Sequence, residues 1–205
     1  VPHAILSGMS SLDEVVARLD ADRMEWIHSP VLARDDLIMG FDEVSHWAGQ
    51  LAAASPMEIR LWRSLVSPDP LLRSRNGYVA FTPFRFTSGN QKFLGAARNL
   101  ALVTTDDQLR SALADGTVRD DTLPSLRWDE RDDLPPVTVI RGRVARPVGK
   151  EWLAFRGLAV LPPIDGAHRW PAKEFTWPLH TDPRSLDELR ELMTDPHRAT
   201  ADRRT

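Results

Sequence analysis

The chain has 205 residues, of which 42% are hydrophobic and 27% are charged, as is ordinary for a globular protein. It has no cysteine, which excludes disulfides and thiolate metal sites. The formal net charge is −3, but basic and acidic blocks alternate along the chain. We find no window that resembles a membrane span and no signal peptide at the start, so we expect a cytoplasmic protein without membrane partners.

The N-terminal third is predicted to be helical. A capping box at Ser11–Glu14 precedes an apolar stripe with the i, i+3, i+4, i+7 spacing of a helix. The same spacing recurs over Val44–Leu51. A further helix starts at Ser55, with proline at its first position. The prolines of Ser67–Pro70 end this region, so the sequence predicts a boundary close to them.

Residues 70–105 contain no aspartate or glutamate. Cations attract phosphates over long distances, and aromatic rings stack on bases. The run is therefore a candidate nucleic-acid surface, although a strand with a basic outer face and a phenylalanine inner face would have the same composition. The basic residues of the run are Arg73, Arg75, Arg85, Lys92 and Arg98, and its aromatic residues are Tyr78, Phe81, Phe84, Phe86 and Phe93.

The second half of the chain carries the patterns typical of strands. The aromatic and β-branched content of Tyr78–Phe86 predicts one strand or two short strands. The apolar stretch Lys92–Thr104 is compatible with either a helix or a strand. Asp115–Asp133 is predicted to be a polar surface loop. A capping box at Ser185–Glu188 predicts a final helix. The remaining predicted strands are Val137–Ile140, Trp152–Val160, and a pair marked by Trp170 and Phe175–Leu179.

Sequence motifs of common enzymes are missing. There is no phosphate-binding loop, dinucleotide fingerprint, nucleophile elbow or zinc-protease motif. No two of the six histidines have the spacing that places a pair on one helix face, so we expect neither a metal nor a cofactor.

Four motifs occur in the order found in SRA (SET- and RING-associated, or YDG) domains, and together they resemble that family over about residues 77–180. At the family's YDG motif the chain has Phe155, Arg156 and Gly157. The motifs are Asn90–Phe93 with Arg98–Leu102, Pro136–Gly142, Leu153–Val160, and Trp170 with Phe175–Leu179.

This resemblance implies a PUA/SRA-like curved β-barrel with flanking helices (71–195). Together with the helical N-terminal region (1–70) and a tail (196–205) that the residue pattern predicts to be disordered, this gives an α+β fold. The resemblance further implies a module that binds double-stranded DNA and flips out a modified, cytosine-type base. Such modules occur in bacterial restriction and defence systems, and the preference for arginine over lysine suggests a GC-rich genome.

The resemblance also assigns site residues. The base pocket would comprise Phe81, Thr82, Phe84, Asn90 and Phe155. The contacts to the DNA backbone would come from Arg73, Arg75, Arg85, Lys92, Arg98, Arg141, Arg143, Arg146 and Arg156.

Two other functions stay open. An enzyme that acts on a flipped base, such as a glycosylase or a divergent nuclease, would use Tyr78, His180 and Asp182. A regulatory dimer on an SRA-like scaffold would use its N-terminal tryptophans as an interface, unless these belong to the core. A nuclease or a second copy of the chain is accordingly a candidate protein partner. The tryptophans in question are Trp26, Trp47 and Trp62.

Overall fold

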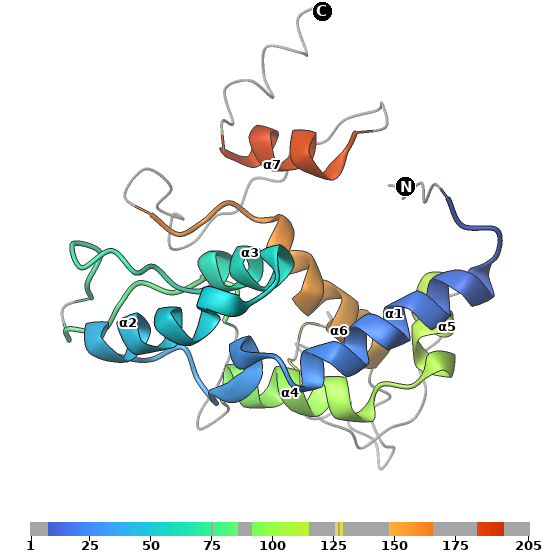
Figure 1. Ribbon diagram of the computed structural model, residues 1–205, viewed down its shortest axis with the longest axis horizontal. Coiled ribbons are helices and arrows are strands. Elements are labelled where there is room, and N and C mark those ends of the chain that lie inside the picture. Colours follow the sequence, from blue (N-terminus) through green and yellow to red (C-terminus); the bar gives the residue numbers. More distant parts are fainter. Residues whose placement is uncertain are drawn as a thin grey trace, which may run out of the picture. The chain divides into compact units, whose positions relative to one another are not determined.

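The computed structural model describes residues 8–74, 76–85, 92–114, 126, 128, 148–165 and 184–194. Of these residues, 65% are helical and 3% have strand-type pairing, so the predicted β-barrel is not seen. The strand-type pairing consists of two isolated antiparallel bridges, Val66 with Phe81 and Arg73 with Val79. The expectation of a PUA/SRA-like barrel was therefore wrong for the described part of the chain, which is helical (Figure 1).

The chain forms two compact units, and each combines segments that are distant in sequence. Unit 1 contains the described residues of 37–85 and 157–194, and unit 2 contains those of 8–36 and 92–156. The division into 1–70, 71–195 and 196–205 stays a prediction. Among the described residues, no helix has both the length and the apolar character needed to cross a membrane.

Unit 2 is a cluster of helices around an aromatic core. The ring of Phe155 has its centroid 5.9 Å from that of Phe93 and 5.8 Å from that of Trp152. All three side chains are almost completely buried. The helical elements of this unit are α1 (Leu12–Ile27), η1 (Pro30–Ala33), α4 (Phe93–Val103), α5 (Asp106–Ala114) and α6 (Val148–Gly157).

Helix α6 replaces the strand predicted over Trp152–Val160. Its buried residues Val148, Trp152 and Phe155 are spaced i, i+4 and i+7, which places them on one helical face. Aromatic content favours strands only weakly, because packing against neighbours decides the outcome. The apolar run Lys92–Thr104 likewise forms helix α4, which buries seven of its residues.

Unit 1 contains the remaining helices and a second pair of aromatic rings. Trp47 and Trp62 meet edge to face, with ring centroids 6.0 Å apart and planes at 88°. Both indoles are buried, as is Trp26 in unit 2, so the three tryptophans belong to the cores. The elements of unit 1 are α2 (Phe41–Gln50), η2 (Leu51–Ala53), α3 (Pro56–Leu65), η5 (Leu158–Val160) and α7 (Leu186–Thr194).

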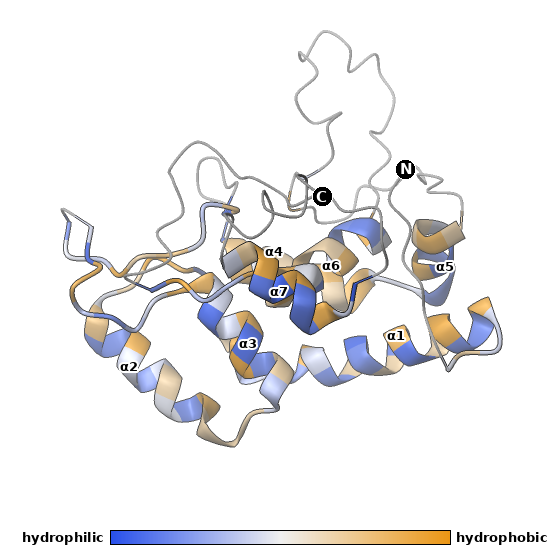
Figure 2. Ribbon diagram, turned by 90° about the horizontal axis from the view of Figure 1, so that it is seen from above, coloured by the Kyte–Doolittle hydropathy of each residue, from blue (hydrophilic) through white to orange (hydrophobic). Residues whose placement is uncertain are grey.

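The predicted helix starts at Ser11, Ser55 and Ser185 are confirmed. At α3 and α7 each serine hydroxyl accepts the glutamate N–H three residues later, and the glutamate carboxylate accepts the serine N–H. At α1 the carboxylate of Glu14 instead accepts from Ser10, one residue before the cap. Figure 2 shows hydrophobic and hydrophilic residues alternating along α1 and α3, as expected of helices with one buried side.

The strands predicted at 137–140, 170 and 175–179 lie outside the described residues, as does the expected tail. Most of the predicted surface loop at 115–133 lies outside them too, but Leu126 is described and buried. Its main-chain N–H donates to the buried carboxylate of Glu151 in α6, as does that of Trp128. This carboxylate therefore attaches residues 126 and 128 of that loop to the core of unit 2.

Candidate nucleic-acid interface

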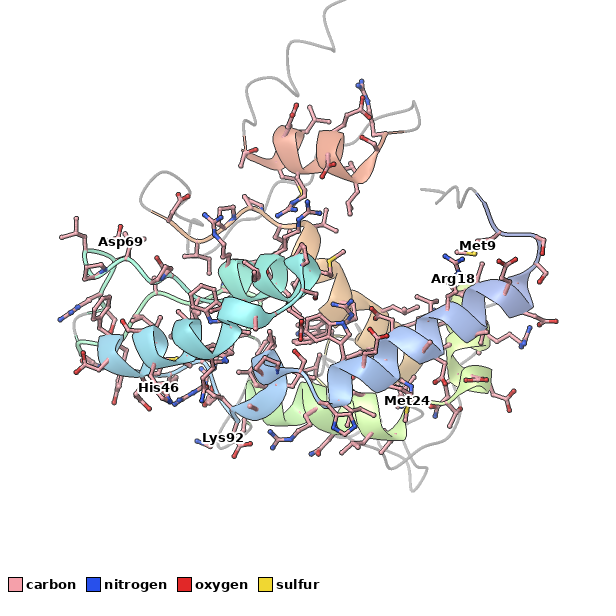
Figure 3. The ribbon with its side chains drawn as sticks, viewed as in Figure 1. Met9, Arg18, Met24, His46, Asp69 and Lys92 are labelled. Atoms are coloured by element: carbon pink, nitrogen blue, oxygen red, sulfur yellow. The ribbon has the colours of Figure 1, made fainter. Side chains whose placement is uncertain are left out.

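The candidate surface for nucleic acid comprises residues 70–85 of unit 1, which we call the acid-free segment. It follows α3 and Asp69, which Figure 3 labels in the loop beyond that helix. Gly77 has a φ of +77°, a conformation that glycine adopts without strain, and it forms the turn between the two halves of the segment.

Main-chain hydrogen bonds hold the two halves together. The N–H of Ala80 donates to the carbonyl of Leu72 over 2.9 Å, and that of Ser74 donates to Tyr78 over 2.7 Å. The N–H of Val79 donates to Met39 over 3.0 Å, which ties the segment to the chain before α2. The strand predicted over Tyr78–Phe86 is thus reduced to a tethered hairpin-like loop with isolated bridges.

Side chains of the acid-free segment divide between an inner and an outer side. Leu72, Val79 and Thr82 are buried, whereas Leu71 is 85% and Tyr78 is 42% exposed. The phenol ring therefore has surface available for stacking, and the buried residues hold the backbone beneath it.

Arg73 is exposed, and its guanidinium carbon lies 5.3 Å from the ring centroid of Phe41. Stacking on a ring occupies the face of a guanidinium and leaves the N–H groups at its edge available. Within the described part of the chain, Arg73 forms no ion pair with a carboxylate. A second arginine of the segment, Arg85, lies over the ring of Phe81 at 5.4 Å.

Three basic residues that were assigned to the DNA backbone are described in unit 2, and each contacts a carboxylate of the same unit. Arg98 bonds to Asp35 over 2.6 Å and to the carbonyl of Leu32 over 2.8 Å. The ammonium of Lys92 lies 3.9 Å from Asp36. Arg156 forms two hydrogen bonds with Asp22 in α1. The other residues with this assignment, Arg75, Arg141, Arg143 and Arg146, lie outside the described residues.

The five residues assigned to the base pocket occupy dissimilar places. Phe155 is fully buried in unit 2, with Phe93 and Trp152 against its ring. Thr82 is also buried, and its hydroxyl accepts the N–H of Phe84 over 3.3 Å. A base could stack on Phe155 only if the aromatic core of unit 2 opened. Phe81 and Phe84 are half-buried in unit 1, and Asn90 lies outside the described residues.

Of the residues considered for catalysis, Tyr78 is on the exposed side of the acid-free segment. His180 and Asp182 lie outside the described residues. Where side chains are described, no three histidine or acidic residues lie close enough together to hold a metal ion.

Two features were missed in the sequence. One is the buried carboxylate of Glu151, which no local pattern distinguishes from a surface glutamate. The other is a group of arginines on α3 and α7, Arg60, Arg63 and Arg190, for which the only sequence signal is the one-turn spacing of the first two.

Comparison of the chain with family models, with curated proteins and with solved structures finds no match. The candidate interface is therefore argued from the residues of this chain alone.

Proposed function

We propose that the protein binds DNA and that the acid-free segment of unit 1 is its contact surface. The observation that carries this proposal is Arg73, an exposed arginine stacked on Phe41 with no carboxylate partner among the described residues. The edge of such a guanidinium can donate two hydrogen bonds to one phosphate. Tyr78, on the same segment, supplies an exposed ring for a base.

The tethering of the segment favours binding. Hydrogen bonds from Val79 and Ala80 already hold its backbone, so little conformational entropy remains to be lost when DNA binds. Phosphate contacts made by arginine are independent of sequence and weaken with salt. A preference for a modified cytosine is the part of the proposal that the SRA resemblance adds.

Fluorescence anisotropy with labelled duplexes tests the proposal. The duplexes carry cytosine, 5-methylcytosine or 5-hydroxymethylcytosine, and a single strand of the same sequence is included. We expect binding at low salt that weakens as salt increases, because bound counterions are released from the phosphates. Failure to bind any of the four at low salt would overturn the proposal.

The variant Arg73→Ala tests whether the acid-free segment is the surface that contacts DNA. The loss of one phosphate contact should weaken binding to all duplexes and make the slope of log K against log salt shallower by about 1. The matched control is Arg18→Ala, which removes an exposed arginine of α1 in unit 2 (Figure 3). Equal affinities for the two variants would exclude the acid-free segment as the contact.

The role of the aromatic ring is tested separately. Tyr78→Phe keeps a ring and should keep the affinity for single strands. Tyr78→Ala should lose about 1–3 kcal/mol of binding free energy, as is typical of one base–aromatic stack. If both variants bind alike, Tyr78 makes no stacking contact.

A further inference from the structure

Helices α3 and α7 of unit 1 contact one another through charged side chains. The guanidinium of Arg60 in α3 lies 3.9 Å from the carboxylate of Asp187 in α7. Arg63 follows one turn after Arg60, and Arg190 one turn after Asp187. The ion pair brings these turns of the two helices together, and Arg60 and Arg63 both act electrostatically on Arg190.

The backbone around these arginines is well anchored. The carbonyl of Arg63, near the end of α3, accepts the N–H of Ile164 over 2.9 Å. This bond joins α3 to the chain that leaves η5, and η5 packs on both α3 and α7. The three arginines thus belong to elements that are packed together.

The three guanidinium groups lie close enough to interact electrostatically. Arg60 and Arg63 both repel Arg190, and this repulsion is partly offset by the carboxylate of Asp187, whose side chain is 79% exposed. Neither Arg63 nor Arg190 makes a hydrogen bond or a close ion pair with a described carboxylate. Burial, followed by repulsion from Arg60, lowers the pKa of Arg190; attraction to Asp187 opposes this lowering, and repulsion from Arg63 adds to it. An anion between the helices would relieve this repulsion.

We propose that Arg60, Arg63 and Arg190 form a binding site for a phosphate group. Guanidinium groups present planar, two-pronged donors that match phosphate oxygens, and several of them can surround one tetrahedral anion. The phosphate belongs either to a small molecule or to a nucleic-acid backbone. This site lies on α3 and α7, outside the acid-free segment, and does not depend on the function proposed above.

Isothermal titration of the full chain with pyrophosphate, at constant ionic strength, measures the site directly. We expect the wild type to bind pyrophosphate, and we expect the dissociation constant to be at least tenfold larger for Arg63→Gln and for Arg190→Gln. Arg18→Gln, which changes an exposed arginine of unit 2, should bind as the wild type does. No binding by the wild type, or equal binding by all variants, would overturn the proposal.

Thermal unfolding without added anion supplies a second readout. Because burial and the repulsion from Arg60 and Arg63 together outweigh the attraction of Asp187 for Arg190, Arg190→Gln should unfold at a higher temperature than the wild type at low salt. Pyrophosphate should raise the unfolding temperature of the wild type and have little effect on the variant. If pyrophosphate raises the unfolding temperature of Arg190→Gln as much as that of the wild type, Arg190 is not part of a phosphate site and the proposal is wrong.

The source of the phosphate is distinguished by titrating the same variants with duplex DNA. If Arg63→Gln and Arg190→Gln weaken only pyrophosphate binding, the ligand is a small phosphate compound. If they weaken both, the site contacts the DNA backbone. Arg73→Ala should leave pyrophosphate binding unchanged, so failure of the proposed DNA surface and failure of this site give different results.

Discussion

Arg156 and Asp22 form a two-pronged ion pair that joins α6 to α1 in unit 2. The Nε atom of the arginine is 3.0 Å from Oδ2, and Nη2 is 2.9 Å from Oδ1. The guanidinium also lies 3.8 Å from the ring centroid of Trp26, and the side chain of Arg156 is 13% exposed. One carboxylate and one indole thus compensate for part of the burial of this cation, whose Nη1 atom is buried without a hydrogen-bond partner among the described residues. These contacts make the arginine part of the structure of unit 2.

We predict that Arg156→Ala destabilises the protein by about 1–3 kcal/mol, because it removes a partly buried ion pair and a cation–π contact. Arg156→Lys keeps the charge but loses the two-pronged hydrogen bonding of the guanidinium. This variant should therefore be more stable than Arg156→Ala and less stable than the wild type. Urea unfolding measures both variants. Arg18→Ala is the exposed control and should change the stability by no more than about 0.5 kcal/mol. A stable Arg156→Ala protein would show that the pair contributes nothing.

Two glycines of α6 should respond in opposite ways to alanine. A Cβ at Gly149 would lie 2.7 Å from the carbonyl carbon of Gln108, so the backbone of α5 would have to move. We expect Gly149→Ala to lower the free energy of unfolding by roughly 1–3 kcal/mol, the usual range for overpacking. Gly157 has helical dihedral angles and open space around it. Gly157→Ala should therefore leave the free energy of unfolding unchanged or raise it by up to about 1 kcal/mol. Thermal unfolding of the pair checks the prediction, which equal midpoints would contradict.

The buried carboxylate of Glu151 accepts the N–H of Leu126 over 2.8 Å and that of Trp128 over 3.1 Å. Glu151→Ala should leave both donors unsatisfied and cost about 2 kcal/mol or more. Amide hydrogen exchange should then become faster at these two positions, and less so in Glu151→Gln, which keeps one acceptor. Glu25→Gln, at an exposed site on α1, is the control. Unchanged exchange in Glu151→Ala would rule out the tether.

Hydrogen bonds from the main-chain N–H and then from the hydroxyl of Ser10 lower the pKa of Glu14 below its ordinary value. A carboxyl group whose pKa is lower in the folded state stabilises that state above its unfolded pKa. This stabilisation is lost as the pH falls through the folded pKa. Ser10→Ala removes the second cause and should raise the pKa part of the way, as carboxyl NMR titration would show.

The neighbouring variant Ser11→Ala provides the control. It removes the hydroxyl that accepts the N–H of Glu14 and leaves both contacts from Ser10 to the carboxylate in place. Helix α1 should become less stable, while the pKa of Glu14 stays low. If Ser11→Ala raises this pKa as much as Ser10→Ala does, the lowering has another origin.

What could be predicted from the sequence was local. The helix starts at Ser55 and Ser185 depend on hydrogen bonds between residues three apart, so the chain within one turn contains all the information needed. The absence of acids over residues 70–105 is likewise a property of the sequence. It remains the basis of the proposed DNA surface.

The tertiary structure decided which of the basic and aromatic residues are accessible. Phe155 and Arg156 were assigned to a pocket and to the DNA backbone, but α6 buries the ring and pairs the guanidinium with Asp22, which is far away in the sequence. Arg98 is paired in the same way with Asp35, whereas Arg73 is not paired with any described carboxylate. Attraction between charges depends on their distance in space, and only the folded chain determines that distance.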